Sequence, residues 1–168
     1  MKKLLPLVLF GFFAFSVSSC SNDDDEYVDY DTYSTVYDLT NVNFEWVDGS
    51  WVYYQPFQNP MYSSDVVLVY LQNGSSAGAP VWQQIPITFY LNDGNEIDYN
   101  FDFTVNDLQL YAGGTFDLGG TSYVNNRTFR VVFVPAEFGN KNANLDYSDY
   151  ESVIEYYNID DSNPVQLN

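Results

Sequence analysis

The stretch EIDYNFDFTV, residues 96–105, decides the fold class of this chain. Apolar residues occupy its odd positions and polar residues its even ones, which is the period of a β-strand with one face in a core and one in water. At about 3.3 Å per residue, such a strand is about 33 Å long. We predict that its odd-numbered side chains are buried and its even-numbered ones exposed, because a slip of one residue would place large apolar groups in water.

Strand patterns also precede this stretch. Residues 35–39 and 42–47 have the composition and alternation of strands, and Asp48-Gly49 separates them from a third strand at 50–54. Asp-Gly accepts the positive φ angles of a type I′ turn and therefore predicts a hairpin. The continuous apolar run 66–71 is typical of a strand that is buried on both faces.

Turn residues divide the remaining strands. Pro86 separates residues 81–85 from 87–91, because proline lacks the donor that a sheet ladder needs. The small residues 73–80 predict a loop. Further strands are predicted at 107–111 and 128–134, with a hairpin around 115–116 between the glycine pairs 113–114 and 119–120.

One helix is predicted near the C-terminus. Ser148 followed by Glu151 matches a capping box, and apolar residues recur at helical spacing until Asn158. That stripe consists of Tyr150, Val153, Ile154 and Tyr157. About eight short strands with turns between them predict a mainly β chain. We expect a single antiparallel β-sandwich, immunoglobulin-like or jelly-roll-like, with one short C-terminal helix across an open edge or end.

The N-terminal residues resemble a bacterial lipoprotein signal. Lys2 and Lys3 precede an apolar run, and the residues before Cys20 are small, as in a lipobox. The 14 residues 4–17 would form a helix of about 21 Å, too short for a bilayer core of about 30 Å, which disfavours a transmembrane anchor. An ordinary secretory signal would not require the cysteine. We predict a signal peptide at 1–19, lipidation of Cys20 and a flexible tether at 20–32, followed by a β-sandwich domain at 33–168.

The acidic run after Cys20 resembles the surface-export tag of Bacteroidetes lipoproteins. It consists of Ser21, Asn22, Asp23, Asp24, Asp25 and Glu26. This resemblance implies a lipid-anchored protein of the outer membrane that faces the outside of the cell. A simple solvated linker on a periplasm-facing protein is the alternative.

Charge and composition limit the function classes. Lys2 and Lys3 belong to the predicted signal, so three basic and 23 acidic residues remain, a net charge of −20. Such a surface repels nucleic acid and anionic lipid heads but tolerates cations and neutral glycans. The chain has no histidine, which excludes Ser-His-Asp and Cys-His catalysis and the usual zinc ligand. It also lacks a Gly-x-Gly-x-x-Gly turn, and no cofactor is predicted.

Two groups of polar residues are candidate sites. Glu96, Asp98 and Asp102 share one strand face, on which Cα atoms two residues apart are separated by about 6.6 Å. This separation lies within the range of glycosidase carboxylate pairs, and the solvated face of a sheet is the alternative interpretation. Oxygen-bearing side chains around a glycine turn could instead hold calcium, although turn chemistry explains them without an ion. These weak calcium candidates are Asn92, Asp93 and Asn95, with Asp160 and Asp161 as further acids.

Aromatic residues offer a third candidate, a platform on which sugar rings could stack. Its members are Trp46, Trp51, Tyr53 and Trp82, with Tyr54 beside them. The alternative is that these residues belong to the core. Arg127 and Arg130 are rare positive charges beside apolar residues, and a structural ion pair with an acid is the expected role of Arg130.

From about residue 64 onward the chain resembles small Bacteroidetes lipoproteins and the C-terminal domains of collagen-like proteins of that phylum. The segments that carry the likeness are 64–70, 99–104, 129–132, 134–135 and 150–159. The collagen repeat itself is absent, and the resemblance implies no catalytic residues.

We therefore expect a non-catalytic binding or envelope-structural module, held at the membrane by its lipid, with a glycan or other surface proteins as partners. A carbohydrate-binding module is the first alternative and a small glycoside hydrolase the second.

Overall fold

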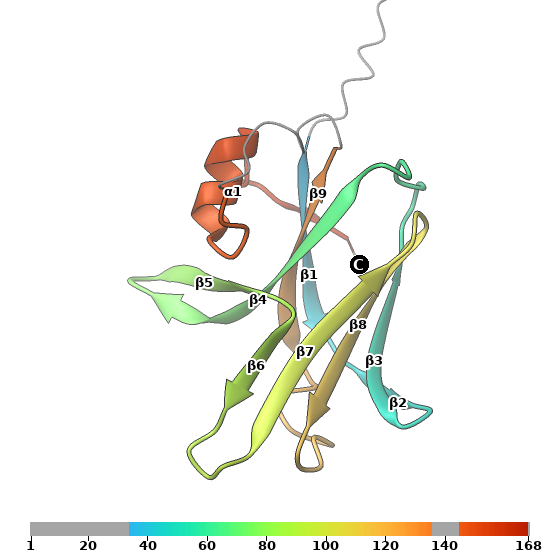
Figure 1. The fold of residues 1–168 in the computed structure, drawn as a ribbon, viewed down its shortest axis with the longest axis vertical. Coiled ribbons are helices and arrows are strands. Elements are labelled where there is room, and N and C mark those ends of the chain that lie inside the picture. The colour runs from blue at the N-terminus through green and yellow to red at the C-terminus, as the bar shows by residue number, and fades with distance from the viewer. Residues whose placement is uncertain (1–33, 136–144, 168) are drawn as a thin grey trace, which may run out of the picture. The chain divides into compact units, whose positions relative to one another are not determined.

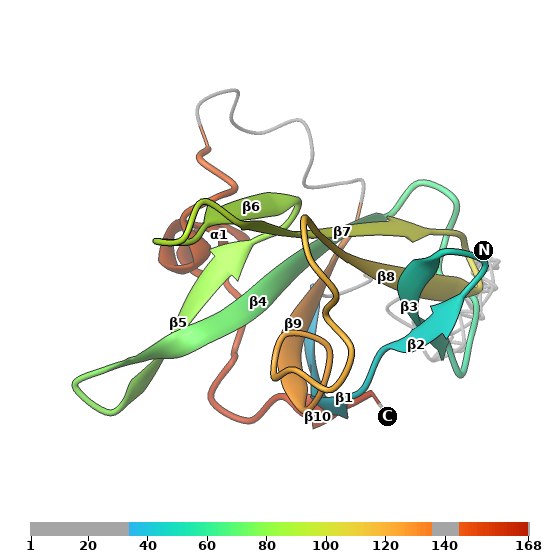
Figure 2. The same cartoon turned by 90° about the horizontal axis from the view of Figure 1, so that it is seen from below.

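The computed structural model describes residues 34–135 and 145–167, so the predicted signal peptide, Cys20 and the acidic tag lie outside the described residues. Within the described ranges, ten strands form two five-stranded sheets, and one short helix lies near the C-terminus (Figures 1 and 2). These features confirm the predicted mainly β fold and are those of a β-sandwich.

Sheet A contains β1 (Thr35–Val42), β4 (Val66–Ser76), β5 (Ala79–Gln84), β9 (Arg127–Val134) and β10 (Val165–Gln166). Sheet B contains β2 (Glu45–Val47), β3 (Ser50–Pro56), β6 (Ile87–Tyr90), β7 (Glu96–Phe103) and β8 (Asp107–Gly114). The strand orders are β10-β1-β9-β4-β5 and β2-β3-β8-β7-β6. All recorded pairings are antiparallel except that of β1 with β10, which is parallel.

Two predictions made from turn and strand-breaking residues are confirmed. Asp48 and Gly49 have φ angles of 50° and 90°, as the hairpin between β2 and β3 requires. Pro86 separates β5 from β6, and these strands belong to different sheets. Because proline cannot continue the ladder, the chain leaves sheet A and enters sheet B at this point.

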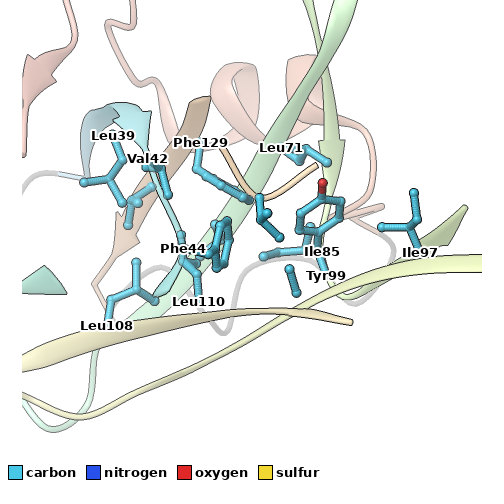
Figure 3. Close-up of a cluster of buried hydrophobic side chains, with 14 of the residues drawn as sticks. Leu39, Val42, Phe44, Leu71, Ile85, Ile97, Tyr99, Leu108, Leu110 and Phe129 are labelled. Atoms are coloured by element: carbon cyan, nitrogen blue, oxygen red, sulfur yellow. The ribbon is translucent and has the colours of Figure 1, made fainter. Parts of the chain in front are cut away.

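The main core lies between the two sheets (Figure 3). Leu39, Leu71 and Phe129 reach it from sheet A, and Tyr99 and Leu110 from sheet B. A second apolar cluster lies on the opposite face of sheet A, under the helix. Residues 67–71 of β4 alternate between the two clusters and are all buried, which confirms the predicted strand with two buried faces.

Helix α1 (Tyr150–Tyr157) begins one residue later than the predicted capping box. Its N-cap is Asp149, whose carboxylate accepts hydrogen bonds from the N–H and hydroxyl of Ser152. Ser148 instead donates to Asp146, so its predicted capping role is wrong. The predicted end is confirmed, since Asn158 has a left-handed φ of 51°.

The position of α1 also differs from the prediction. Tyr150, Val153 and Tyr157 pack against Tyr70 and Val132, on the face of sheet A that points away from sheet B. The helix therefore covers a sheet face and not an edge or end. Strands β4 and β9 carry apolar residues on both faces. Sheet B buries one face, and α1 buries the other.

Strand β7 follows the predicted alternation only in its first half. Ile97 and Tyr99 are each 1% exposed, and Phe101 is half-buried. Phe103 and Val105 are 38% and 36% exposed, so the prediction that all odd positions are buried is wrong there. Phe103 stacks on Phe101 of its own strand, with ring centroids 6.3 Å apart. The alternating pattern thus extends past the end of the core.

Two further predictions are wrong. Residues 73–80 are not a loop, because β4 and β5 extend through them as a hairpin that turns at Ala77-Gly78. Their small, exposed side chains do not pack against a core, and the pairing between the two strands is enough to hold them in a hairpin. No strand lies between β8 and β9 in the described chain, so the hairpin expected around 115–116 does not form.

Arg130, on β9, links β1, β5, the helix and the C-terminal segment. Its guanidinium donates to both carboxylate oxygens of Asp38, at 2.7 and 3.0 Å, and to the Tyr150 hydroxyl at 2.7 Å. It also donates to Asp161 at 3.1 Å and lies 4.4 Å from the centroid of the Trp82 ring. Burial alone would lower the pKa of Arg130, but the hydrogen bonds to Asp38 and Tyr150 raise it. The predicted structural ion pair is confirmed.

Two alanine substitutions on β7 test where the core ends. Ile97→Ala should lower the free energy of unfolding by about 2–5 kcal/mol, because it opens a cavity between the sheets. Phe103→Ala should cost under about 1 kcal/mol, because its ring is already partly in water. Urea unfolding followed by circular dichroism measures both values. Equal losses would contradict the described end of the core.

Arg130→Met should lower the free energy of unfolding by about 3–5 kcal/mol, because it leaves the largely buried Asp38 without its cation. Arg127→Met is the matched control on the same strand. Arg127 lies 5.6 Å from the centroid of the Tyr99 ring, and loss of such a contact should cost about 1 kcal/mol. A loss at Arg130 no larger than that at Arg127 would show that the ion pair does not stabilise the fold.

Candidate ligand-binding site

The structure divides the four residues of the predicted aromatic platform. Trp46 and Trp51 lie on β2 and β3 in sheet B, whereas Trp82 lies on β5 in sheet A and packs beside Arg130 under α1. Tyr53 packs against the main core. The four residues therefore do not form one surface, because the strands that carry them belong to different sheets.

Trp46 and Trp51 remain together at one edge of sheet B. They are direct cross-strand partners, so both side chains project from the same face of the sheet. Their ring centroids are 5.4 Å apart at an interplanar angle of 62°. Trp51 packs against the core, whereas Trp46 is 60% exposed. A large indole that is held in water on a rigid partner is the kind of residue that binds ligands.

A hollow of about 410 Å³ opens beside this pair. The β2–β3 turn, the end of β8 and the loop after β8 form its walls. It is lined by Trp46, Gly49, Ser50, Trp51, Ala112, Gly113, Gly114, Phe116, Asp117 and Leu118. We call this hollow the Trp46 notch. Its volume lies within the range of about 300–1,000 Å³ that is typical of small-molecule sites.

Close packing holds the loop wall of the Trp46 notch in place. A Cβ atom on Gly114 would lie 2.9 Å from Cδ2 of Leu118, so glycine lets the loop approach β8. A Cβ atom on Gly119 would lie 3.6 Å from the ring of Trp51. Asp117 accepts a hydrogen bond from the N–H of Gly119 at 2.9 Å. The carboxylate of Asp117 is thereby held at the rim.

The carboxylates proposed for hydrolysis lie on the exposed face of sheet B. Glu96, Asp98 and Asp102 are all exposed, as predicted for the even positions of β7. Asp102 accepts a 2.8 Å hydrogen bond from the hydroxyl of Tyr111. Burial and this hydrogen bond raise the pKa of Tyr111. Asp98 lies over Gly113, where a Cβ atom would come within 2.6 Å of its Oδ1.

The calcium candidates are held by turn chemistry. Both carboxylate oxygens of Asp93 accept hydrogen bonds from Asn95, and these bonds lower the pKa of Asp93. Asn95 accepts from the hydroxyl of Thr115, and Asn92 is exposed on the same turn. Asp160 accepts from Ser162. Over residues 34–135 and 145–167, no group of three or more acidic, histidine or cysteine side chains could hold a metal.

A second hollow, of about 270 Å³, lies beside β1 and β10. Phe57, Met61 and Phe133 give it an apolar lining. Thr35 and Pro135 also line it, and they lie at or next to the ends of a described range. We place no site there.

Comparison of the chain with models of protein families, with curated proteins and with solved structures gives no match. Among the described residues, no helix has both the length and the apolar character needed to cross a bilayer.

Sequence reasoning identified both tryptophans of the notch but missed its other wall. Gly113-Gly114 and Gly119-Gly120 lie on either side of Phe116 and Asp117, and their spacing predicts a hairpin that the structure does not form. The paired glycines were the available signal, since a tight loop against a strand also requires them. Asp38 and Asp161, the partners of Arg130, are far from it in sequence and carried no local signal.

Fluorescence quenching tests the exposure of Trp46. Of the three tryptophans, Trp46 is exposed, whereas Trp51 and Trp82 are partly buried. We expect Trp46→Phe to remove most of the emission that acrylamide quenches readily, while Trp82→Phe leaves that component in place. If quenching is unchanged in Trp46→Phe, the indole is covered.

Proposed function

We propose that this chain is a lipid-anchored protein of the outer membrane whose β-sandwich is a non-catalytic binding module. The signal at 1–19 directs lipidation of Cys20, and residues 20–32 tether the domain. The acidic residues 21–26 favour display on the outside of the cell over a periplasm-facing position. The resemblance to small Bacteroidetes lipoproteins supports the same assignment.

The observation that carries the binding role is the exposed indole of Trp46 beside the notch. The outer face of sheet A is covered by α1, whereas Trp51 is the only ring partner of Trp46 within residues 34–135 and 145–167. A tryptophan retained in water at such a position is typical of a binding surface. An envelope-structural role would place another surface protein on the same edge.

Carbohydrate is the ligand class that the site favours. The apolar face of a sugar ring stacks on an indole, while polar groups around it serve the hydroxyls. Hydrolysis by Glu96, Asp98 and Asp102 is less well supported, because these carboxylates lie on an open sheet face and Asp102 is already bound by Tyr111. Nucleic acid is disfavoured as a partner by the net charge of −20 after signal removal.

Membrane attachment depends on Cys20 in this proposal. Cys20→Ala should move the protein from the membrane fraction to the soluble fraction, because the thiol that carries the lipid is lost. Fractionation followed by immunoblotting measures the change. Retention of the variant in the membrane would contradict the lipid anchor.

Protease treatment of intact cells separates the two orientations. Digestion of the domain before lysis supports surface display. Protection until lysis would show that the domain faces the periplasm.

A further inference from the structure

We propose that the Trp46 notch binds one terminal sugar ring that carries no negative charge, and that Asp117 makes amino sugars the preferred ligands. This inference rests on the proposed binding function and assigns its site and ligand chemistry. A saccharide end, and not the middle of a chain, is inferred because the notch has walls on several sides.

The aromatic wall supplies the stacking surface. Trp51 is held by the core and by the Gly119 backbone, and Trp46 leans on Trp51 at 5.4 Å. The pair is therefore positioned before any ligand arrives. Binding then costs little side-chain entropy, since the rings need not be ordered.

Polar residues also line the Trp46 notch. Ser50 lines it from the hairpin, and Asp117, an exposed residue, lines it from the loop after β8. Gly49 is exposed on the hairpin turn, with open space where a side chain would lie, whereas the carboxylate of Asp98 partly covers Gly113. A sugar ring has an apolar face and a polar rim, and the lining of the notch likewise includes both aromatic and polar residues.

Charge decides which sugars fit. The strands of sheet B contain no lysine or arginine, and their charged residues are all acidic. Arg127 and Arg130 both lie on β9 of sheet A, half-buried and buried. A uronic or sulfated sugar in the notch would therefore meet the carboxylate of Asp117, and the strands of sheet B offer no cation to offset the repulsion. An ammonium group on the sugar would instead be attracted to it.

Titration with three oligosaccharide series tests the inference: glucosamine oligomers, neutral glucose oligomers and galacturonate oligomers. The protein is the full chain with Cys20→Ala, and tryptophan fluorescence reports binding. We expect glucosamine oligomers to bind more tightly than glucose oligomers, and galacturonate oligomers not to bind. Trp46→Ala should weaken both interactions at least about tenfold, as expected for an aromatic anchor.

Asp117→Asn provides the matched test of charge. The amide oxygen can still accept from Gly119, so the loop is retained while the charge is lost. We expect the preference for glucosamine over glucose oligomers, about twofold to fivefold, to disappear while glucose binding is unchanged. Tyr90→Ala is the control for an exposed aromatic outside the notch, since Tyr90 is 78% exposed on β6. It should bind as the parent does.

Other outcomes would overturn the inference. If glucosamine oligomers still bind the Trp46→Ala variant, their binding is nonspecific electrostatic attraction to an acidic protein and not binding in the notch. Sugar binding that is lost in Tyr90→Ala but kept in Trp46→Ala would place the site elsewhere, with the binding function intact. Absence of binding to all three series would reject the sugar site. If a surface protein then binds at the same edge, the proposed binding function stands although the sugar inference is wrong.

Discussion

The contacts of the Arg130 guanidinium are the interaction on which the packing of α1 against sheet A depends. It joins β1 through Asp38, α1 through Tyr150 and the segment after the helix through Asp161, while its face lies on Trp82 of β5. The carboxylate partners neutralise a charge that burial would otherwise disfavour. Without this cation, the apolar cluster under α1 would enclose Asp38 at great cost. The helix and sheet A are therefore stabilised together.

This arrangement has a consequence for the surface. The described residues contain two arginines and no lysine, and both arginines lie on β9. These two arginines are thus half-buried or buried on sheet A, while the charged side chains on the strands of sheet B are all acidic. The edge at Trp46 is consequently an exposed aromatic surface in a negative field, and in the proposed binding role it would admit fewer ligands than an uncharged aromatic surface.

Local patterns predicted the parts of the fold that depend on neighbours in sequence. The alternation around Tyr99, the apolar run of β4 and the Asp48-Gly49 turn each carried a signal within a few residues. Strand order has no such local signal. The sequence therefore does not separate Trp82 from Trp46, although their strands lie in different sheets. The extent of the core is also a tertiary property. The pattern of β7 continues through Phe103, but nothing in the sequence shows where the facing sheet ends.

The parallel pairing of β10 with β1 bears on how the domain withstands force. Strand β1 is the first strand after the predicted tether, and it lies between β9 on one side and β10 on the other. A pull from the N-terminal side runs along β1, so the hydrogen bonds to both neighbours are loaded together in shear. An edge strand could be peeled away one bond at a time. The Asp38–Arg130 pair lies within the same strand contact, so the strand that would receive a pull from the predicted tether is joined to β9 by an ion pair as well as by backbone hydrogen bonds.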